Sequence, residues 1–158
     1  MSSIFSKIIA QEIPSYKIAE NAHFYAFLDI MPLCEGHTLV VPKKEVDQFF
    51  DIPAALLQEL MVFAQPIAKA IEKSFNCKRV GIAVIGLEVP HAHLHLVPIN
   101  SADDLNFTRG KLKLSAAELQ EVHGPEAHAV RRQADVLGRL QDEGGVVDLA
   151  ARVPAKRA

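Results

Sequence analysis

Apolar residues recur at helical spacing near the start of the chain, where Ile4, Phe5, Ile8 and Ile9 follow two serines suited to cap a helix. We therefore predict a short helix over residues 4–10. The residues that follow change to the short, β-branched and aromatic runs that are typical of strands. These runs predict strands over the segments 17–20, 23–28 and 37–41.

A longer apolar stripe with a helical period occupies the middle of the chain. It extends from Leu57 to Phe75, and Asp51 and Pro53 before it form a helix-start signal. Pro66 falls inside the stripe, so we expect either a kink or one unpaired carbonyl. The stripe predicts one long helix that packs its apolar face on the rest of the domain.

Two apolar runs after this helix predict strands over residues 79–85 and 91–99, joined by a bend from Gly86 to Pro90. The order is then helix, strands, long helix and strands, with short connections between neighbours. This order favours an α+β fold with a mainly antiparallel sheet. We expect the main domain to cover residues 1–112, followed over 113–158 by a helix and a peripheral tail whose composition favours disorder.

Composition and charge exclude some classes of partner. The chain has 158 residues, enough for one domain, and a formal net charge of −2, so no broad basic field attracts nucleic acid or anionic lipid. No stretch reaches the ~20 apolar residues of a membrane helix, and the N-terminus does not resemble a signal peptide. We expect a cytoplasmic protein that binds neither nucleic acid nor membrane, with its two cysteines reduced.

The most informative segment is His91-Ala92-His93-Leu94-His95. Strand alternation places the three histidines on one face and the apolar residues on the other. Three imidazoles in register are too costly for ordinary packing, because each buried ring needs polar partners. The segment therefore predicts a functional site.

Two kinds of chemistry are compatible with this face. A metal ion would use two of the three histidines, since residues four apart on a strand are separated by ~13 Å, and would need further ligands such as His37 and Asp29. Alternatively, a neutral imidazole can attack phosphorus when its other nitrogen holds the proton. Neighbouring rings would then donate to the phosphate oxygens, and the spacing favours this second chemistry.

The histidine segment resembles the signature of the histidine triad (HIT) family, in which three histidines alternate with apolar residues. The segments Phe27-Leu28-Asp29-Ile30 and His37-Thr38-Leu39-Val40-Val41-Pro42-Lys43 are also similar to the first strands of that family. The first residues, from Ile4 to Pro14, are similar to its Hint-like branch. The resemblance covers residues 3–99 and implies a HIT-like fold, a homodimer and a purine nucleotide substrate.

The resemblance also implies roles for individual residues. His93 would be the nucleophile that forms a covalent nucleotidyl-histidine, and the carbonyl of His91 would accept from its ring. His95 would donate to a phosphate oxygen, with His37 behind it in the hydrogen-bonded group. Asp29 would bind the ribose hydroxyls. The base pocket would be lined by Phe5, Ile8, Phe27, Ile30 and Leu39.

The chain departs from the family pattern just before the triad, where Leu87 stands in place of a common Gln and Glu88 in place of Ser or Thr. That hydroxyl assists the leaving group in the Hint-like branch, and a neutral Glu88 would be able to donate a proton instead. Some relatives also bind structural zinc through Cys-x-x-Cys. Ser3 and Ser6 stand at those positions, so we expect no such zinc site.

The sequence thus predicts an enzyme that cleaves purine nucleoside phosphoramidates or related nucleotides at the α-phosphate, without a cofactor or an obligatory metal. Three alternatives stay open. One is a hydrolase of dinucleoside polyphosphates, the activity of the Fhit-like branch. Another is a nucleotide-binding or interaction protein with little turnover, and the third is a histidine-based metal hydrolase.

Overall fold

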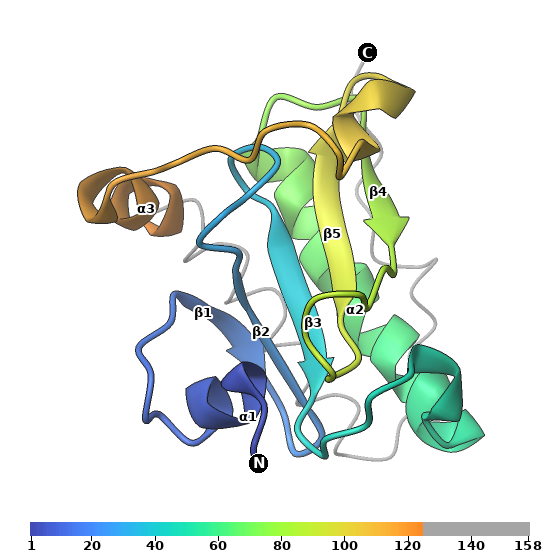
Figure 1. The fold of residues 1–158 in the computed structure, drawn as a ribbon. Helices are drawn as coiled ribbons and strands as arrows, with labels where there is room; N and C mark the ends of the chain where they lie inside the picture. The colour runs from blue at the N-terminus through green and yellow to red at the C-terminus, as the bar shows by residue number, and fades with distance from the viewer. Residues whose placement is uncertain (125–158) are drawn as a thin grey trace.

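The computed structural model describes residues 1–124, so the predicted tail lies outside the described residues. The described residues form a five-stranded sheet in the order β1-β2-β3-β5-β4, in which all neighbours are antiparallel (Figure 1). This confirms the predicted α+β fold. The strands are β1 (Lys17–Glu20), β2 (Phe24–Leu28), β3 (Thr38–Pro42), β4 (Arg79–Ala83) and β5 (Leu94–Ile99).

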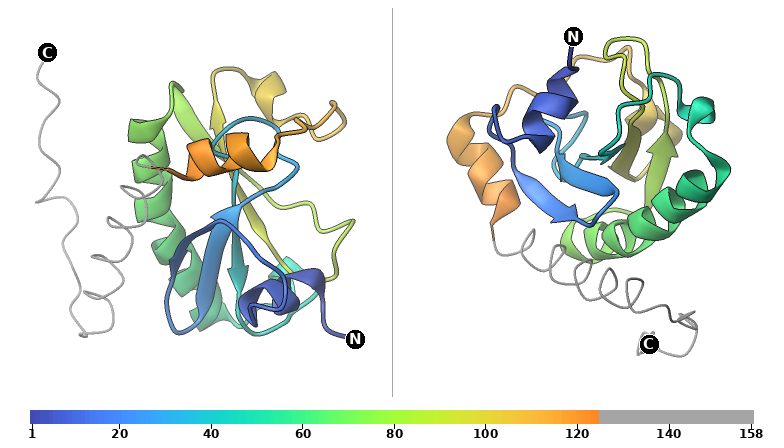
Figure 2. Two further views of the ribbon diagram at one scale, coloured as in Figure 1. Left: turned by 90° about the vertical axis from the view of Figure 1, so that its left-hand side faces the viewer. Right: turned by 90° about the horizontal axis from the view of Figure 1, so that it is seen from below.

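Helices lie on both faces of the sheet. Figure 2 shows the long helix α2 along one face and the short helix α1 on the opposite side. The helices are α1 (Ile4–Ile9), α2 (Ala54–Ser74) and α3 (Ala116–His123), with short 3₁₀ turns η1 (Phe49–Asp51) and η2 (Ala102–Leu105). Ser3 caps α1, and Ser115 and Glu118 form the capping box that begins α3.

Strand alternation sorts the apolar residues into two clusters. Val40, Leu94 and Leu96 face α2 and form the main core with its buried residues. On the other face, Phe27 and Leu39 pack with α1 in a smaller aromatic cluster. Leu39 is the cross-strand partner of His95, so this second face is also the face that carries the histidines.

Helix α2 is long and apolar enough to cross a membrane by length and composition alone. Its apolar stripe, however, is the centre of the main core, with Leu60, Ile67 and Ile71 fully buried against the sheet. A helix at the centre of a hydrophobic core can have the same length and apolar composition as a membrane-spanning helix. Pro66 lies inside this helix, which is continuous from Ala54 to Ser74.

The prediction of a strand over 91–99 was wrong at its start, because β5 begins only at Leu94. The neighbouring strand β3 ends at Pro42, which has no amide hydrogen for the ladder. The amide of Ala92 instead donates to the carbonyl of Val46 in the following loop, at 2.7 Å. His91 and His93 therefore belong to an irregular segment that leads into β5.

Candidate functional site

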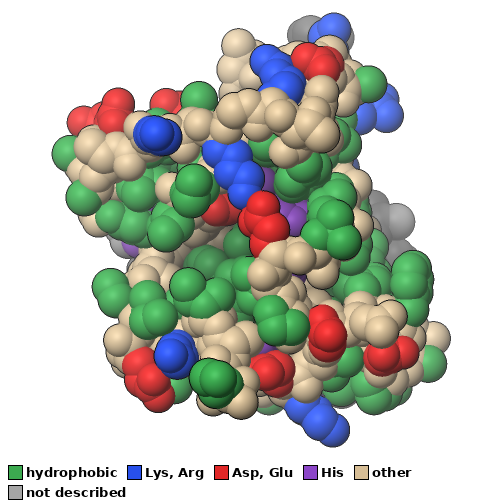
Figure 3. Space-filling view, viewed as in Figure 1, with side chains coloured by type: hydrophobic (Ala, Val, Ile, Leu, Met, Phe, Trp, Pro, Cys, Tyr) green, Lys and Arg blue, Asp and Glu red, His purple; other side chains and the backbone are tan. Residues whose placement is uncertain are grey.

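The three histidines lie together even though only His95 belongs to β5. Each is at most 7% exposed, and the ring centroids of His93 and His95 are 4.9 Å apart. Phe5 of α1 packs edge-on against both His91 and His93. Figure 3 shows histidine side chains at the bottom of a hollow on this face, with basic and acidic side chains beside it.

His91 is fully buried and ties helix α1 to the rest of the site. Its Nε2–H donates to the carbonyl of Pro42 at 2.8 Å, which leaves Nδ1 as an acceptor. The hydroxyl of Ser3 donates to this Nδ1 at 2.7 Å, and Ser6 and the amide of Ser3 both donate to Glu45. At the two serine positions, where some relatives have zinc-binding cysteines, this chain therefore forms a hydrogen-bonded network.

We predict that Ser3→Ala lowers the free energy of unfolding by roughly 1–3 kcal/mol, because it removes a helix cap and leaves a buried imidazole nitrogen unpaired. Urea denaturation measures the change. The matched control is Ser2→Ala, since Ser2 is exposed and next to it in the chain. Equal stability of the two variants would contradict the prediction.

His93 has its ring orientation fixed by the backbone. Its Nδ1–H donates to the carbonyl of His91 at 2.7 Å. Because a neutral imidazole carries one proton, Nε2 of His93 then keeps a free lone pair. This is the protonation pattern that a nucleophilic imidazole needs.

His37 and His95 form a second hydrogen-bonded chain with a defined direction. The amide of Leu33 donates to Nδ1 of His37 at 3.0 Å, so the proton of His37 is on Nε2. Nε2 of His37 lies 2.9 Å from Nδ1 of His95 and donates to it. The proton of His95 is therefore on Nε2, where it is available to an acceptor. Gly36 precedes this pair with a φ of 85°, a left-handed conformation that favours glycine.

Burial keeps these rings neutral. It lowers the pKa of His37 to about 4 and the pKa of His95 to about 3, and the positive charge of Lys111 adds to both effects. Burial also lowers the pKa of His91. At neutral pH His37, His91 and His95 therefore act as hydrogen-bonding groups and contribute no positive charge.

Asp29 lies at the end of β2, next to this pair. One carboxylate oxygen accepts from the amide of Met31 at 2.9 Å, and the other lies 3.8 Å from Nε2 of His37. Four of the five residues predicted for the base pocket lie in the aromatic cluster on this face, namely Phe5, Ile8, Phe27 and Leu39. Ile30 is 59% exposed, outside that cluster.

Asp29, His37 and His95 also form the kind of group that can hold a metal ion. Their ligand atoms lie within 4.8 Å of one another, and imidazole and carboxylate are suitable zinc ligands. A metal there would displace the proton that His37 shares with His95. Metal binding and the hydrogen-bonded pair are thus mutually exclusive.

Glu88 is exposed and is not buried with the histidine rings. Its side chain is 80% exposed and its carboxylate lies 3.4 Å from Nζ of Lys111. Sequence reasoning missed Lys111 and also Phe107, whose ring packs on His95 with centroids 4.8 Å apart. Neither residue belongs to a recognisable motif, so only the three-dimensional path of the chain shows that they lie at the site. Ser3 was considered as a zinc position, but its bond to His91 was not foreseen.

Comparison with known proteins matches residues 10–102 to the HIT domain. Adenosine 5'-monophosphoramidase HNT1 of Saccharomyces cerevisiae is 43% identical over 96 residues, which are 60% of this chain and 61% of that protein. The chain therefore spans less than two thirds of that relative.

Two solved structures are similar in fold. A Hit-like protein from Bartonella henselae superposes with a TM-score of 0.69 at 30% identity, covering 84% of this chain and 96% of its own. A Zn-bound histidine triad family protein from Mycobacterium smegmatis superposes with a TM-score of 0.63 at 27% identity, and the match covers 92% of this chain and 99% of that protein. The resemblance seen in the sequence is confirmed: the chain belongs to the HIT family.

Proposed function

We propose that the protein is a nucleotide hydrolase that acts at the α-phosphate through a covalent bond to His93. The observation that carries this proposal is the 2.7 Å bond from Nδ1 of His93 to the carbonyl of His91, which leaves Nε2 with a lone pair. The similarity to a monophosphoramidase supports a purine nucleoside phosphoramidate as substrate.

The reaction would have two steps. Nε2 of His93 attacks the α-phosphorus as the bond to the leaving amine breaks, and the amine takes up a proton as it departs. A water molecule then attacks the same phosphorus, the bond to Nε2 breaks, and nucleoside monophosphate is released with the imidazole restored. The proposed proton donor for the amine is Glu88, which has to leave Lys111 and take up a proton from solvent before it can donate. In the second step the Glu88 carboxylate takes up the proton that the attacking water releases.

His95 would bind a non-bridging phosphate oxygen in both steps. Its proton lies on Nε2 because His37 occupies Nδ1, so it donates without carrying a charge. A donor that is already oriented in a buried site needs no rearrangement when charge develops on the phosphate. His37 would act as a positioning residue that sets this proton.

The nucleoside would lie between Asp29 and the aromatic cluster. The oxygen of Asp29 that does not accept from Met31 is available to a ribose hydroxyl. Phe5 and Phe27 would supply the apolar wall of a purine pocket, and Ile30 would contact the base from its exposed position.

Mass spectrometry of acid-sensitive adducts tests this function. We expect protein mixed with an adenosine phosphoramidate and quenched in alkali to gain one adenylyl group on His93, and to turn the substrate over in the presence of chelator. Nucleotide binding without adduct or turnover would favour a binding protein, and loss of turnover in chelator would favour the metal site of Asp29, His37 and His95. Faster cleavage of a dinucleoside polyphosphate would instead indicate the Fhit-like activity.

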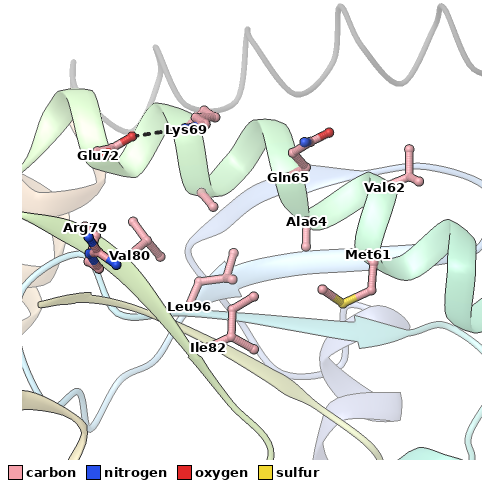
Figure 4. Close-up of a pocket in the computed structure, with 11 residues that line it drawn as sticks. Met61, Val62, Ala64, Gln65, Lys69, Glu72, Arg79, Val80, Ile82 and Leu96 are labelled. Atoms are coloured by element: carbon pink, nitrogen blue, oxygen red, sulfur yellow. Dashed lines mark hydrogen bonds and ion pairs between the residues drawn. The ribbon is translucent and has the colours of Figure 1, made fainter. Parts of the chain in front are cut away.

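We further infer that two copies associate through the outer edge of β4. No other described strand pairs with that edge, and a groove of about 490 Å³ lies beside it along α2 (Figure 4). Met61, Val62 and Ile82 line the groove and are 42–49% exposed. Antiparallel pairing of one β4 with another obeys a two-fold axis and covers both the edge and these apolar side chains.

We predict that Ile82→Glu converts the dimer to monomer, because two carboxylates would then be buried across the interface. Sedimentation equilibrium measures this as a halved mass at micromolar concentration. The control is Phe50→Glu, since Phe50 is 87% exposed and does not line the groove. A monomeric unmodified protein, or a dimeric Ile82→Glu variant, would contradict the proposed interface.

We also infer a cytoplasmic location. Cys34 and Cys77 are both free thiols. Burial raises the pKa of Cys34 to about 11, so it is an unreactive thiol compatible with a reducing compartment.

A further inference from the structure

The segment between η2 and α3 brings a lysine to the histidine site from outside the family domain. The family match ends at residue 102, and Lys111 follows it. Figure 1 shows this segment crossing the end of the sheet above β3 and β5. Two contacts on either side of Lys111 hold the segment there: Phe107 packs on His95, and the amide of Leu112 donates to the carbonyl of Pro32 at 2.8 Å.

The charge balance of the site indicates what this lysine does. A nucleoside monophosphate carries one to two negative charges at neutral pH, yet His37 and His95 are neutral and Asp29 is acidic. A buried anion without a positive partner is unfavourable. Among the described residues, Lys111 is the lysine or arginine whose charge acts on both of these histidines.

Lys111 has one partner in the described structure, and that partner is exposed. Its Nζ lies 3.4 Å from the carboxylate of Glu88, whose side chain is 80% exposed. Exposed ion pairs of this kind contribute little to stability, so exchanging one for a phosphate costs little. Glu88 is also where this chain departs from the family's Ser or Thr. A residue at a position where the chain departs from the family pattern therefore contacts a lysine that follows the family match.

We propose that Lys111 binds the phosphate of the bound nucleotide and that Glu88 holds Lys111 beside the site when no nucleotide is present. This inference rests on the proposed nucleotide site and adds to it a cationic ligand for the α-phosphate. The ammonium group would move from the carboxylate to a non-bridging phosphate oxygen, opposite the donor Nε2 of His95. Glu88 would be released by the same movement.

Calorimetric titration with AMP and with adenosine tests the proposal, since only AMP carries the phosphate. We expect Lys111→Met to weaken AMP binding about tenfold or more, as for loss of a charge-assisted bond, and to leave adenosine binding unchanged. The matched control is Lys113→Met, because Lys113 is exposed on the same segment. Glu88→Gln should strengthen AMP binding several-fold, and this gain should vanish in the double variant with Lys111→Met.

The outcomes separate this proposal from the proposed function. Equal AMP affinity in Lys111→Met and the unmodified protein would overturn the role of Lys111, even if His93 forms an adduct. An equal loss of AMP and adenosine binding would also overturn it, because the variant would then have disturbed the pocket. Weaker AMP binding in Lys111→Met, with no adduct on His93, would keep Lys111 as a phosphate ligand and refute the hydrolase.

Discussion

Replacement of His93 by alanine is expected to lower kcat/KM for an adenosine phosphoramidate by about a thousandfold or more, since no other group replaces a covalent nucleophile. Binding of AMP should weaken much less than turnover, because the donor of His95 and the pocket of Asp29 are unchanged. Steady-state kinetics and calorimetry on the same preparation measure the two effects. The exposed ring of His23 gives the control variant His23→Ala.

A second variant tests whether the alanine variant loses activity because the site is disturbed or because the attacking nitrogen is missing. His93→Asn places an amide where Nδ1 was, so it can still donate to the carbonyl of His91, but it lacks the attacking nitrogen. We expect this variant to fold with nearly unchanged stability and to be as inactive as the alanine variant. Substantial turnover by His93→Asn would mean that the ring acts through its position and not as a nucleophile.

The free energy of unfolding is expected to fall steeply as the pH decreases from about 6.5 towards 4. The pKa values of His37 and His95 are lowered to about 4 and about 3 in the folded state, from an ordinary value of 6.5. In this window the unfolded chain therefore binds protons that the folded protein excludes. Each such histidine removes up to about 1.4 kcal/mol per pH unit, and the loss is absent above pH 7.

Urea denaturation at several pH values between 5 and 7 measures this slope. In that window carboxylates such as Glu20 and Asp104, whose pKa values are lowered, stay ionised in the folded protein and contribute little. His37→Gln should flatten the slope because it removes one buried titrating ring. A stability that does not vary between pH 5 and 7 would mean that water reaches these rings.

Local pattern was sufficient for the elements and for the face that carries the histidines. The stripe from Leu57 to Phe75 predicted α2. Strand alternation placed His95 and Leu94 on opposite faces of the sheet, as observed. Such patterns are readable because helix and strand periods fix which side chains share a face. The start of this strand at residue 91 was predicted incorrectly, because the ladder between β3 and β5 ends at the pair of Val40 and Leu94, and Pro42 has no amide hydrogen to extend it.

The sequence by itself determined the α+β fold and the membership of the HIT family, because both depend on short-range patterns, and the resemblance to that family made His93 the candidate nucleophile. Only the tertiary structure decided which nitrogen carries the proton in His37, His91 and His95, since that depends on Leu33, Pro42 and Ser3, which are far from the triad in the chain. It also brought Lys111 and Glu88 together across 23 positions. Hydrogen bonds and ion pairs of this kind follow from three-dimensional packing, which no local pattern encodes.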